Sequence, residues 1–176
     1  DKSSFSRPPS LLSLPHPLSS SSASSTTLPR PIRILELGAG QSGLCGIALQ
    51  HMQLHCDGVL GSENIHATSF PRISDILITD GNRACIEDGV KYQIEWNEAI
   101  HKKRTGRDGN TDTNESVIPS LPPTKCQLLE WNRDTDYSHL GRFDLILVAD
   151  CLFFRAYHID LCHVLRSLLQ PVTGRA

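Results

Sequence analysis

The sequence has no surplus of basic residues, and this absence argues against whole classes of partner. Its 176 residues include 17 Lys and Arg against 19 Asp and Glu, a formal net charge of −2. A chain with this balance has no general attraction for nucleic acid or for anionic membranes. It also lacks an uninterrupted apolar run of the roughly 20 residues that a membrane span needs. We therefore expect neither a nucleic-acid nor a membrane partner.

Closely spaced cysteine pairs are missing as well. The six cysteines are scattered along the chain without any C-x-x-C, and several lie within apolar or helical segments. This distribution favours reduced, buried thiols in an intracellular protein over a disulfide framework. Two short groups of histidine and cysteine, within residues 51–56 and 158–163, lack a full tetrahedral set with recognisable finger spacing. We therefore expect no metal site.

Composition divides the chain into a tail and one domain. Residues 1–30 are rich in serine and proline, which predicts a disordered tail, and residues 31–176 carry the domain. Within that domain, residues 103–124 form a long polar stretch with a double proline, expected to be a disordered loop. The chain begins with Asp1 instead of methionine and ends in an apparent turn. Both ends suggest a fragment, and nothing demands an oligomer, so a monomer is expected.

Hydrophobic periodicity within the domain predicts alternating strands and helices. The expected strands are residues 32–37, 75–79, 125–131 and 143–149, and the expected helices are about 42–53, 83–102 and 156–169. Residues 55–74 are expected to form a loop or insertion. Apolar strands alternating with amphipathic helices predict a mostly parallel, doubly wound α/β sheet covered on both faces.

A glycine turn follows the first expected strand. Gly38, Gly40 and Gly43 stand at G-x-G-x-x-G spacing between that strand and the next helix. This layout is typical of a nucleotide-like ligand that lies beside backbone at a helix N-terminus, where a Cβ would block its approach. A turn without any ligand is the simpler alternative.

Ligands of parallel sheets bind at the carboxyl ends of strands, so the side chains there are the candidate site. Asp80 can accept hydrogen bonds from ribose hydroxyls, although either it or Asn82 can instead cap the next helix. Trp131 offers a flat face to an adenine ring, although a lone tryptophan is more often a core or rim aromatic. Asp150 would lie beside the reactive end of the ligand, or would cap the last helix, or both.

The motifs at these positions together resemble a known family. The segment ILELGAGQSGLCGIAL is similar to motif I of the seven-β-strand S-adenosylmethionine-dependent methyltransferases. With ILITDGN, LLEWN and FDLILVADCLFF, the chain most resembles the protein-lysine methyltransferases, and among them the calmodulin-lysine N-methyltransferase branch. The resemblance covers about residues 32–172. It implies a Rossmann-like class I methyltransferase fold that is incomplete here, with strands 5 to 7 missing.

The resemblance also assigns roles to individual residues. It implies S-adenosylmethionine as cofactor, calmodulin or another protein as substrate, and the cytoplasm, with the nucleus second, as location. The residues that it implies for cofactor binding are Glu36, Gly38, Ala39, Gly40, Asp80, Asn82, Trp131 and Ala149. Asp150 is the catalytic candidate, because a carboxylate can orient the lysine amine or accept its proton. Many relatives have D-x-x-Y after the fourth strand, whereas this chain has Phe153 in place of the tyrosine.

Two other functions compete with this interpretation. A nicotinamide-dependent oxidoreductase shares the glycine turn and the acid after the second strand, but it does not predict LLEWN or ADCLFF. A methyltransferase-like domain that binds a partner without turnover is the non-enzymatic alternative. The basic run Lys102–Arg104 is most simply a solvated helix end, and it is also a place where an acidic protein such as calmodulin could bind.

Overall fold

A computed structural model describes residues 30–59, 71–105 and 120–171, with the backbone alone for residues 55–59. Most of the expected tail and of the expected polar loop therefore lies outside the described residues. Four strands form one sheet: β1 (Ile32–Leu37), β2 (Ile73–Asp80), β3 (Thr124–Leu128) and β4 (Leu145–Val148). The sheet order is β3-β2-β1-β4, and every pairing is parallel. The predicted α/β fold with a parallel sheet is confirmed.

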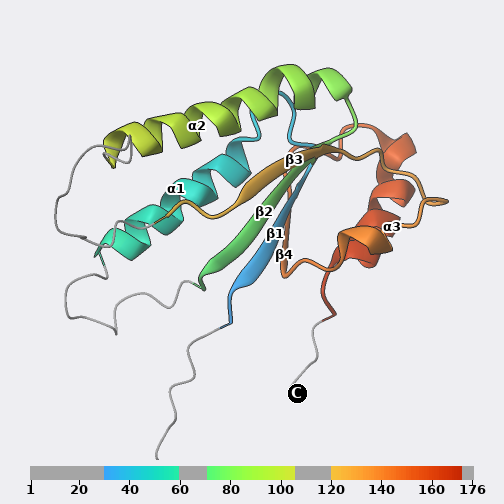
Figure 1. Cartoon of the computed structure of the whole chain (residues 1–176). Helices are drawn as coiled ribbons and strands as arrows, with labels where there is room; N and C mark the ends of the chain where they lie inside the picture. Colours follow the sequence, from blue (N-terminus) through green and yellow to red (C-terminus); the bar gives the residue numbers. More distant parts are fainter. Residues whose placement is uncertain (1–29, 60–70, 106–119, 172–176) are drawn as a thin grey trace, which may run out of the picture.

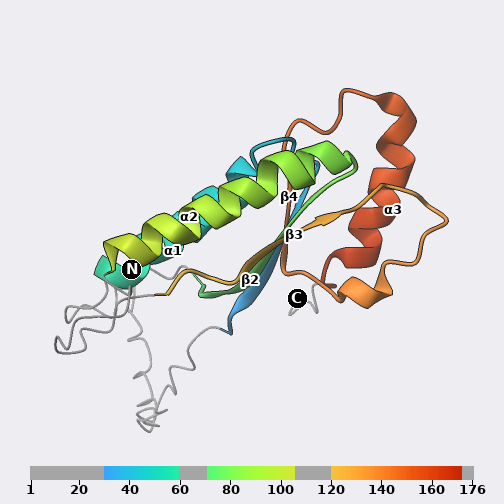
Figure 2. The same cartoon turned by 45° about the horizontal axis from the view of Figure 1, so that its top comes forward.

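Helices cover both faces of this sheet (Figures 1 and 2). One face carries α1 (Leu44–Val59) and α2 (Lys91–Arg104), and α2 continues a π-helical turn, η1 (Cys85–Val90). The other face carries α3 (His158–Leu168), and two short 3₁₀ turns, η2 (Ser138–Leu140) and η3 (Arg155–Tyr157), lie in the connections before and after β4. Within the described residues, no helix has the length and apolar character that crossing a membrane requires.

The alternation of side chains along β1 explains the two layers of core. Ile34 points to the face of α1 and α2, where it joins an isoleucine-rich cluster with Ile78 of β2. Leu35 and Leu37 point the other way and pack in a cluster with Val164 of α3. Each of these five side chains is fully buried, and burial of such a side chain contributes about 1.5–3 kcal/mol to stability. β1 is therefore the central strand that both helical layers hold in place.

Several predicted boundaries differ from those in the structure. The first helix continues to Val59, so part of the loop expected at residues 55–74 is helical, and α2 likewise continues two residues into the loop expected at residues 103–124. β3 ends at Leu128 rather than at residue 131, and one further backbone bond to β2 runs from Leu129 N to Asp80 O at 2.9 Å. β4 begins at Leu145 because the backbone of Phe143 instead bonds to the end of α3, through Leu168 O and Gln170 N.

Within the described residues, β4 forms the edge of the sheet. It pairs with β1 on one side, and Leu145 is 38% exposed. The expectation that three further strands belong to the complete fold stays a prediction.

Candidate functional site

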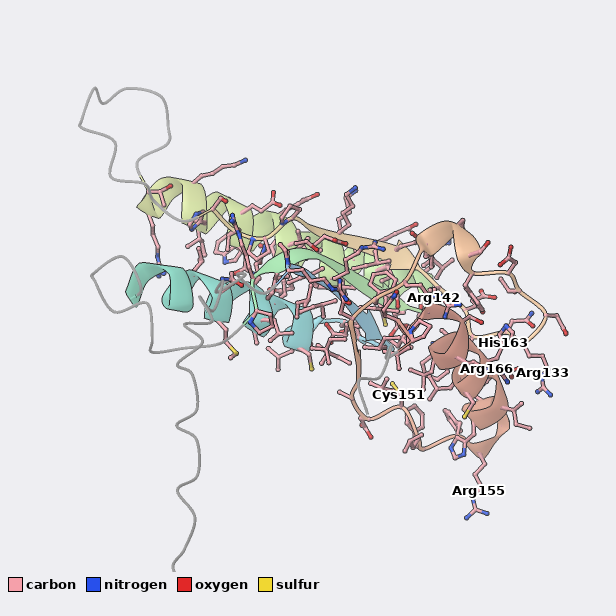
Figure 3. All side chains as sticks on the ribbon, turned by 90° about the horizontal axis from the view of Figure 1, so that it is seen from below. Arg133, Arg142, Cys151, Arg155, His163 and Arg166 are labelled. Carbon is pink, nitrogen blue, oxygen red and sulfur yellow. The ribbon has the colours of Figure 1, made fainter. Side chains whose placement is uncertain are left out.

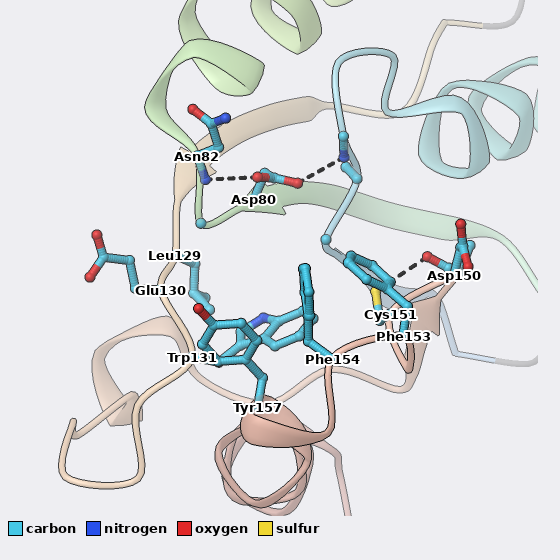
Figure 4. A pocket seen from close by; sticks show the side chains of 15 residues that line it. Asp80, Asn82, Leu129, Glu130, Trp131, Asp150, Cys151, Phe153, Phe154 and Tyr157 are labelled. Atoms are coloured by element: carbon cyan, nitrogen blue, oxygen red, sulfur yellow. Dashed lines mark hydrogen bonds between the residues drawn. The ribbon is translucent and has the colours of Figure 1, made fainter.

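A pocket of about 940 Å³ opens at the carboxyl ends of the strands (Figure 4). It lies where the sheet order reverses between β1 and β4, the position at which parallel sheets of this kind bind ligands. Its volume is within the range of cofactor sites. The residues that line it are Gly38, Ala39, Gly40, Asp80, Gly81, Asn82, Leu129, Glu130, Trp131, Ala149, Asp150, Cys151, Phe153, Phe154 and Tyr157. Of the nine predicted site residues, all except Glu36 are among them.

The glycine turn forms the floor of the pocket next to β1. Gly38 has a φ of +65°, and a Cβ added there would lie 2.6 Å from Cys151 Sγ and 3.2 Å from the Trp131 ring. Gly40 also has a positive φ, but nothing lies within 4 Å of its added Cβ. The third glycine of the motif, Gly43, lies against Ile78 and serves helix packing instead. Gly38 is thus the position where only hydrogen fits.

Asp80 ends β2 and ties the glycine turn to the loop after β2. One carboxylate oxygen accepts from the Gly40 amide at 2.8 Å, and the other accepts from the Asn82 amide at 2.7 Å. Each carboxylate oxygen has two lone pairs, so the group can still accept hydrogen bonds from a ligand. Asp80 therefore shapes the pocket, and its carboxylate can also accept a hydrogen bond from a ligand there.

Asn82 lines the pocket and also caps the following helical segment. Its side-chain oxygen accepts from the Ala84 amide at 3.0 Å. The capping role that the sequence left open between Asp80 and Asn82 thus belongs to Asn82. A contact between Asn82 and a cofactor stays a prediction.

Glu36 lies beneath the pocket instead of lining it. It is only 3% exposed, and its two oxygens accept from the Cys45 amide at 3.3 Å and the Gly46 amide at 2.7 Å. Burial raises the pKa of this carboxyl, and the two amide hydrogen bonds oppose that shift. Glu36 thereby holds the start of α1 against β1 and fixes the path of the glycine turn from below.

Trp131 belongs to both the pocket and the core. Its half-buried ring packs against the cluster that contains Leu37 and lies beside Gly38. Its indole Nε1 is buried and has no hydrogen-bond partner among the described residues. The loop that carries it is closed by Tyr137, whose buried hydroxyl donates to Glu130 O at 2.7 Å and accepts from the Asn132 amide at 2.9 Å. Sequence reasoning missed Tyr137, which follows a polar turn.

The segment after β4 makes an unusual turn at Asp150. This residue has a φ of +52°, a left-handed conformation that aspartate tolerates better than most residues. Its side chain is exposed and accepts no hydrogen bond from the described residues. The expected N-cap role is wrong, because the first turn of helix after it begins only at Arg155. Asp150 is therefore a free carboxylate at the pocket, next to Ala149.

Cys151 seals the base of the pocket beneath Gly38. Its Sγ lies 3.3 Å from Leu37 O and 3.2 Å from Ala149 O, so the thiol proton donates to one of these carbonyls. Burial raises the pKa of the thiol, and the nearby carboxylates of Asp80, Asp150 and Glu36 raise it further. Cys151 thus stays a protonated thiol that fills space.

Three exposed aromatic side chains form the outer wall. The Phe153 and Phe154 ring centroids are 4.5 Å apart, and Tyr157 lies edge-on to Phe154 at 6.1 Å. All three are more than half exposed although they line the pocket. The sequence singled out Phe153, whereas Phe154 and Tyr157 were missed, although the aromatic run that follows ADCL was the signal for them.

The charge of the lining limits what this pocket can hold. Its fifteen residues include three carboxylates, Asp80, Glu130 and Asp150, and no lysine or arginine. Three carboxylates without a cationic side chain match a cofactor that carries a positive charge. Within the described residues, no group of histidine, cysteine and acidic side chains could hold a metal ion.

Comparison with known proteins finds a family match for the part of the chain that begins shortly before β3. Residues 110–174 match the family model of lysine methyltransferases. The matched part contains β3, β4 and α3, and with them Trp131 and Asp150. The glycine turn lies outside the match.

A curated relative points the same way. Over 138 residues, the chain is 25% identical to calmodulin-lysine N-methyltransferase from Arabidopsis thaliana. The similarity covers 78% of this chain and 33% of that protein, so the chain spans about a third of the length of the curated relative. Both comparisons are similarities to lysine methyltransferases, so they support that family and leave the individual member open. The match to a methyltransferase family implies chemistry that depends on S-adenosylmethionine.

Proposed function

We propose that this chain carries the cofactor site of an S-adenosylmethionine-dependent protein-lysine N-methyltransferase, with calmodulin as the substrate. The observation that carries the proposal is the pocket at the carboxyl ends of the strands, whose lining combines the glycine turn with three carboxylates and no basic side chain. Such a lining suits a sulfonium cofactor. The calmodulin assignment rests on the similarity to the plant enzyme, because nothing in the pocket itself selects one protein substrate.

The residues present fit this cofactor. Asp80 would accept from the ribose hydroxyls, and Trp131 would lie against the adenine, with its orphaned indole N–H as a donor. Gly38, Ala39 and Gly40, together with Ala149, would line the methionine portion, because the missing Cβ of Gly38 leaves room there. Glu36 contributes indirectly, because it fixes the turn that would make these contacts. When bound, the cofactor supplies an already activated methyl group.

The task left to the protein is to position the lysine and to remove its charge. Free lysine has a pKa near about 10.4, so the amine is protonated at neutral pH and cannot attack until it loses that proton. Asp150 offers an exposed, unbonded carboxylate next to Ala149. It would orient the amine and accept its proton.

An isosteric substitution tests the role of Asp150. In Asp150→Asn, the amide tolerates the left-handed backbone conformation but cannot take a proton. We expect a rate at pH 7.5 lower by a factor of about ten to a hundred, with an unchanged Kd for the cofactor. The deficit should shrink as the pH approaches 10, where the amine is neutral without help. Calmodulin methylation measured against pH, with cofactor binding measured in parallel, checks this. An unchanged rate across the whole pH range contradicts the assignment.

A second candidate is a methyltransferase-like domain that binds cofactor and partner without turnover. The observation in its favour is that the lining of the pocket could bind a cofactor whether or not methyl transfer follows. Saturable cofactor binding without methylation of calmodulin would support this alternative. Methylation of calmodulin by this chain would exclude it.

A further inference from the structure

The exposed face of α3 carries a pattern that the proposed chemistry does not use. Arg155 of η3, Ile159 and Arg166 follow at spacings of four and seven residues, which places them on one side of the helix. The opposite side buries Leu161 and Val164 in the core. Ile159 is 62% exposed, and both arginines are exposed. We call Arg155, Ile159 and Arg166 the α3 stripe.

The charges of the α3 stripe are not neutralised within the described residues. Neither Arg155 nor Arg166 forms an ion pair there, whereas the acidic residue of the helix, Asp160, is already paired with Arg133 at 2.8 Å. Arg142 adds a guanidinium at the end of the helix, where it donates to Arg166 O and Leu169 O. Figure 3 shows these arginines gathered around α3, with Arg155 pointing away from the ribbon. The result is a cationic surface with an apolar centre on a chain whose formal net charge is −2.

This surface is continuous with the mouth of the pocket. Arg155 stands between Phe154 and Tyr157, which both belong to the aromatic wall. A protein that inserts a side chain past Phe154 and Tyr157 would therefore come close to η3 and the start of α3.

We propose that the α3 stripe binds an acidic surface of the protein substrate beside the lysine that enters the pocket. The inference rests on the proposed function, because it assigns the place at which that substrate docks. Carboxylates on the partner would pair with Arg155 and Arg166, and an apolar side chain would cover Ile159. Charged groups around such a contact chiefly set the association rate and its dependence on salt.

Charge reversal at two surfaces tests the proposal. The stripe variant is Arg155→Glu/Arg166→Glu, and the matched control is Lys91→Glu/Lys125→Glu, at exposed positions of α2 and β3, which makes the same change in net charge. The probe is purified calmodulin, titrated by fluorescence anisotropy at about 50 and 300 mM salt, because surface charges are screened more strongly at the higher concentration. Circular dichroism and S-adenosylmethionine binding verify that both variants keep the fold and the pocket.

We expect the stripe variant to bind calmodulin about tenfold more weakly at the lower salt concentration, with a smaller difference at the higher one. The control should bind like the parent chain. Equal effects of the two variants, a larger loss in the control, or no binding of calmodulin by the parent chain would overturn the proposal. If the chain binds calmodulin through the stripe but never methylates it, the docking proposal stands and the proposed catalytic function fails.

Discussion

At the scale of single residues, Gly38 is the position where the pocket has the least room. Gly38→Ala combines a strained positive φ with an approach of 2.6 Å to Cys151 Sγ. Gly40→Ala has a similar φ of +62° but no neighbour within 4 Å, so it isolates the backbone contribution. We expect Gly40→Ala to cost about 1–2 kcal/mol of unfolding free energy. Gly38→Ala should cost about 1–3 kcal/mol more, because it adds overpacking. Urea unfolding measures both.

A double variant determines whether the clash is the cause. Because Cys151→Ala removes the sulfur, Gly38→Ala/Cys151→Ala should recover part of the loss caused by Gly38→Ala, and the Trp131 ring at 3.2 Å should prevent full recovery. Equal unfolding free energies for Gly38→Ala and Gly40→Ala would contradict this description of the turn.

Residues of the candidate site differ in how far the sequence could predict them. Asp80 and Asp150 directly follow or end apolar strands, so the rule for parallel sheets located them. Glu36 obeys the same pattern but points beneath the turn, because the free amides at the start of α1 attract its carboxylate. Phe154 and Tyr157 lie in and just after the aromatic run that follows ADCL, but the hydrophobic pattern alone does not specify that these side chains line the pocket.

At the scale of elements, Asp144 links β4 to β1. Its carboxylate accepts from the Arg33 amide at 2.9 Å and pairs with Arg30, and the Asp144 amide donates to Arg33 O at 2.9 Å. Burial acts to raise the pKa of Asp144, but the Arg33 amide and the Arg30 guanidinium outweigh it and hold the pKa below the ordinary value. The native state is therefore stabilised by the ionised form.

Asp144→Asn should accordingly lower stability in a manner that depends on pH. At pH 7 we expect a loss of about 1–2 kcal/mol, because a charged acceptor is replaced by a neutral one. Because the pKa of Asp144 is lower in the folded state, the ionised carboxylate stabilises the wild type fully above the unfolded-state pKa of about 3.9. This contribution is lost as the pH falls from that value through the folded-state pKa. Urea titrations between pH 7 and pH 3 should show the two proteins converging at the acid end. A constant difference would contradict the linkage.

The bounds of elements were predictable where local pattern and tertiary contacts agree. β1 occupies the expected residues 32–37, since every side chain in its C-terminal two-thirds is buried. Phe143 was expected within the fourth strand because it is apolar, yet its backbone bonds to the end of α3, and only the tertiary packing of that helix determines this. The π-helical turn before α2 likewise has no signal in the hydrophobic pattern.

At the scale of the whole molecule, the pocket depends on strand order. The sequence predicts parallel strands, but the order β3-β2-β1-β4 arises from long-range pairing that periodicity does not encode. This order brings the ends of β1, β2 and β4 together and thereby joins Gly38, Asp80 and Asp150 in one pocket, although they are far apart in the chain. A ligand that bridges these loops should stabilise the fold by about 2.7 kcal/mol at a hundredfold excess over its Kd.

Calorimetric titration of S-adenosylmethionine into the folded chain addresses the cofactor assignment directly. The informative variant is Asp80→Ala, and the matched control is Asp75→Ala, which removes a carboxylate near the other end of the same strand, where it pairs with Arg33. We predict saturable binding with one site, at least tenfold weaker in Asp80→Ala and unchanged in Asp75→Ala. No binding by the folded chain, or equal binding by Asp80→Ala, would contradict the cofactor site.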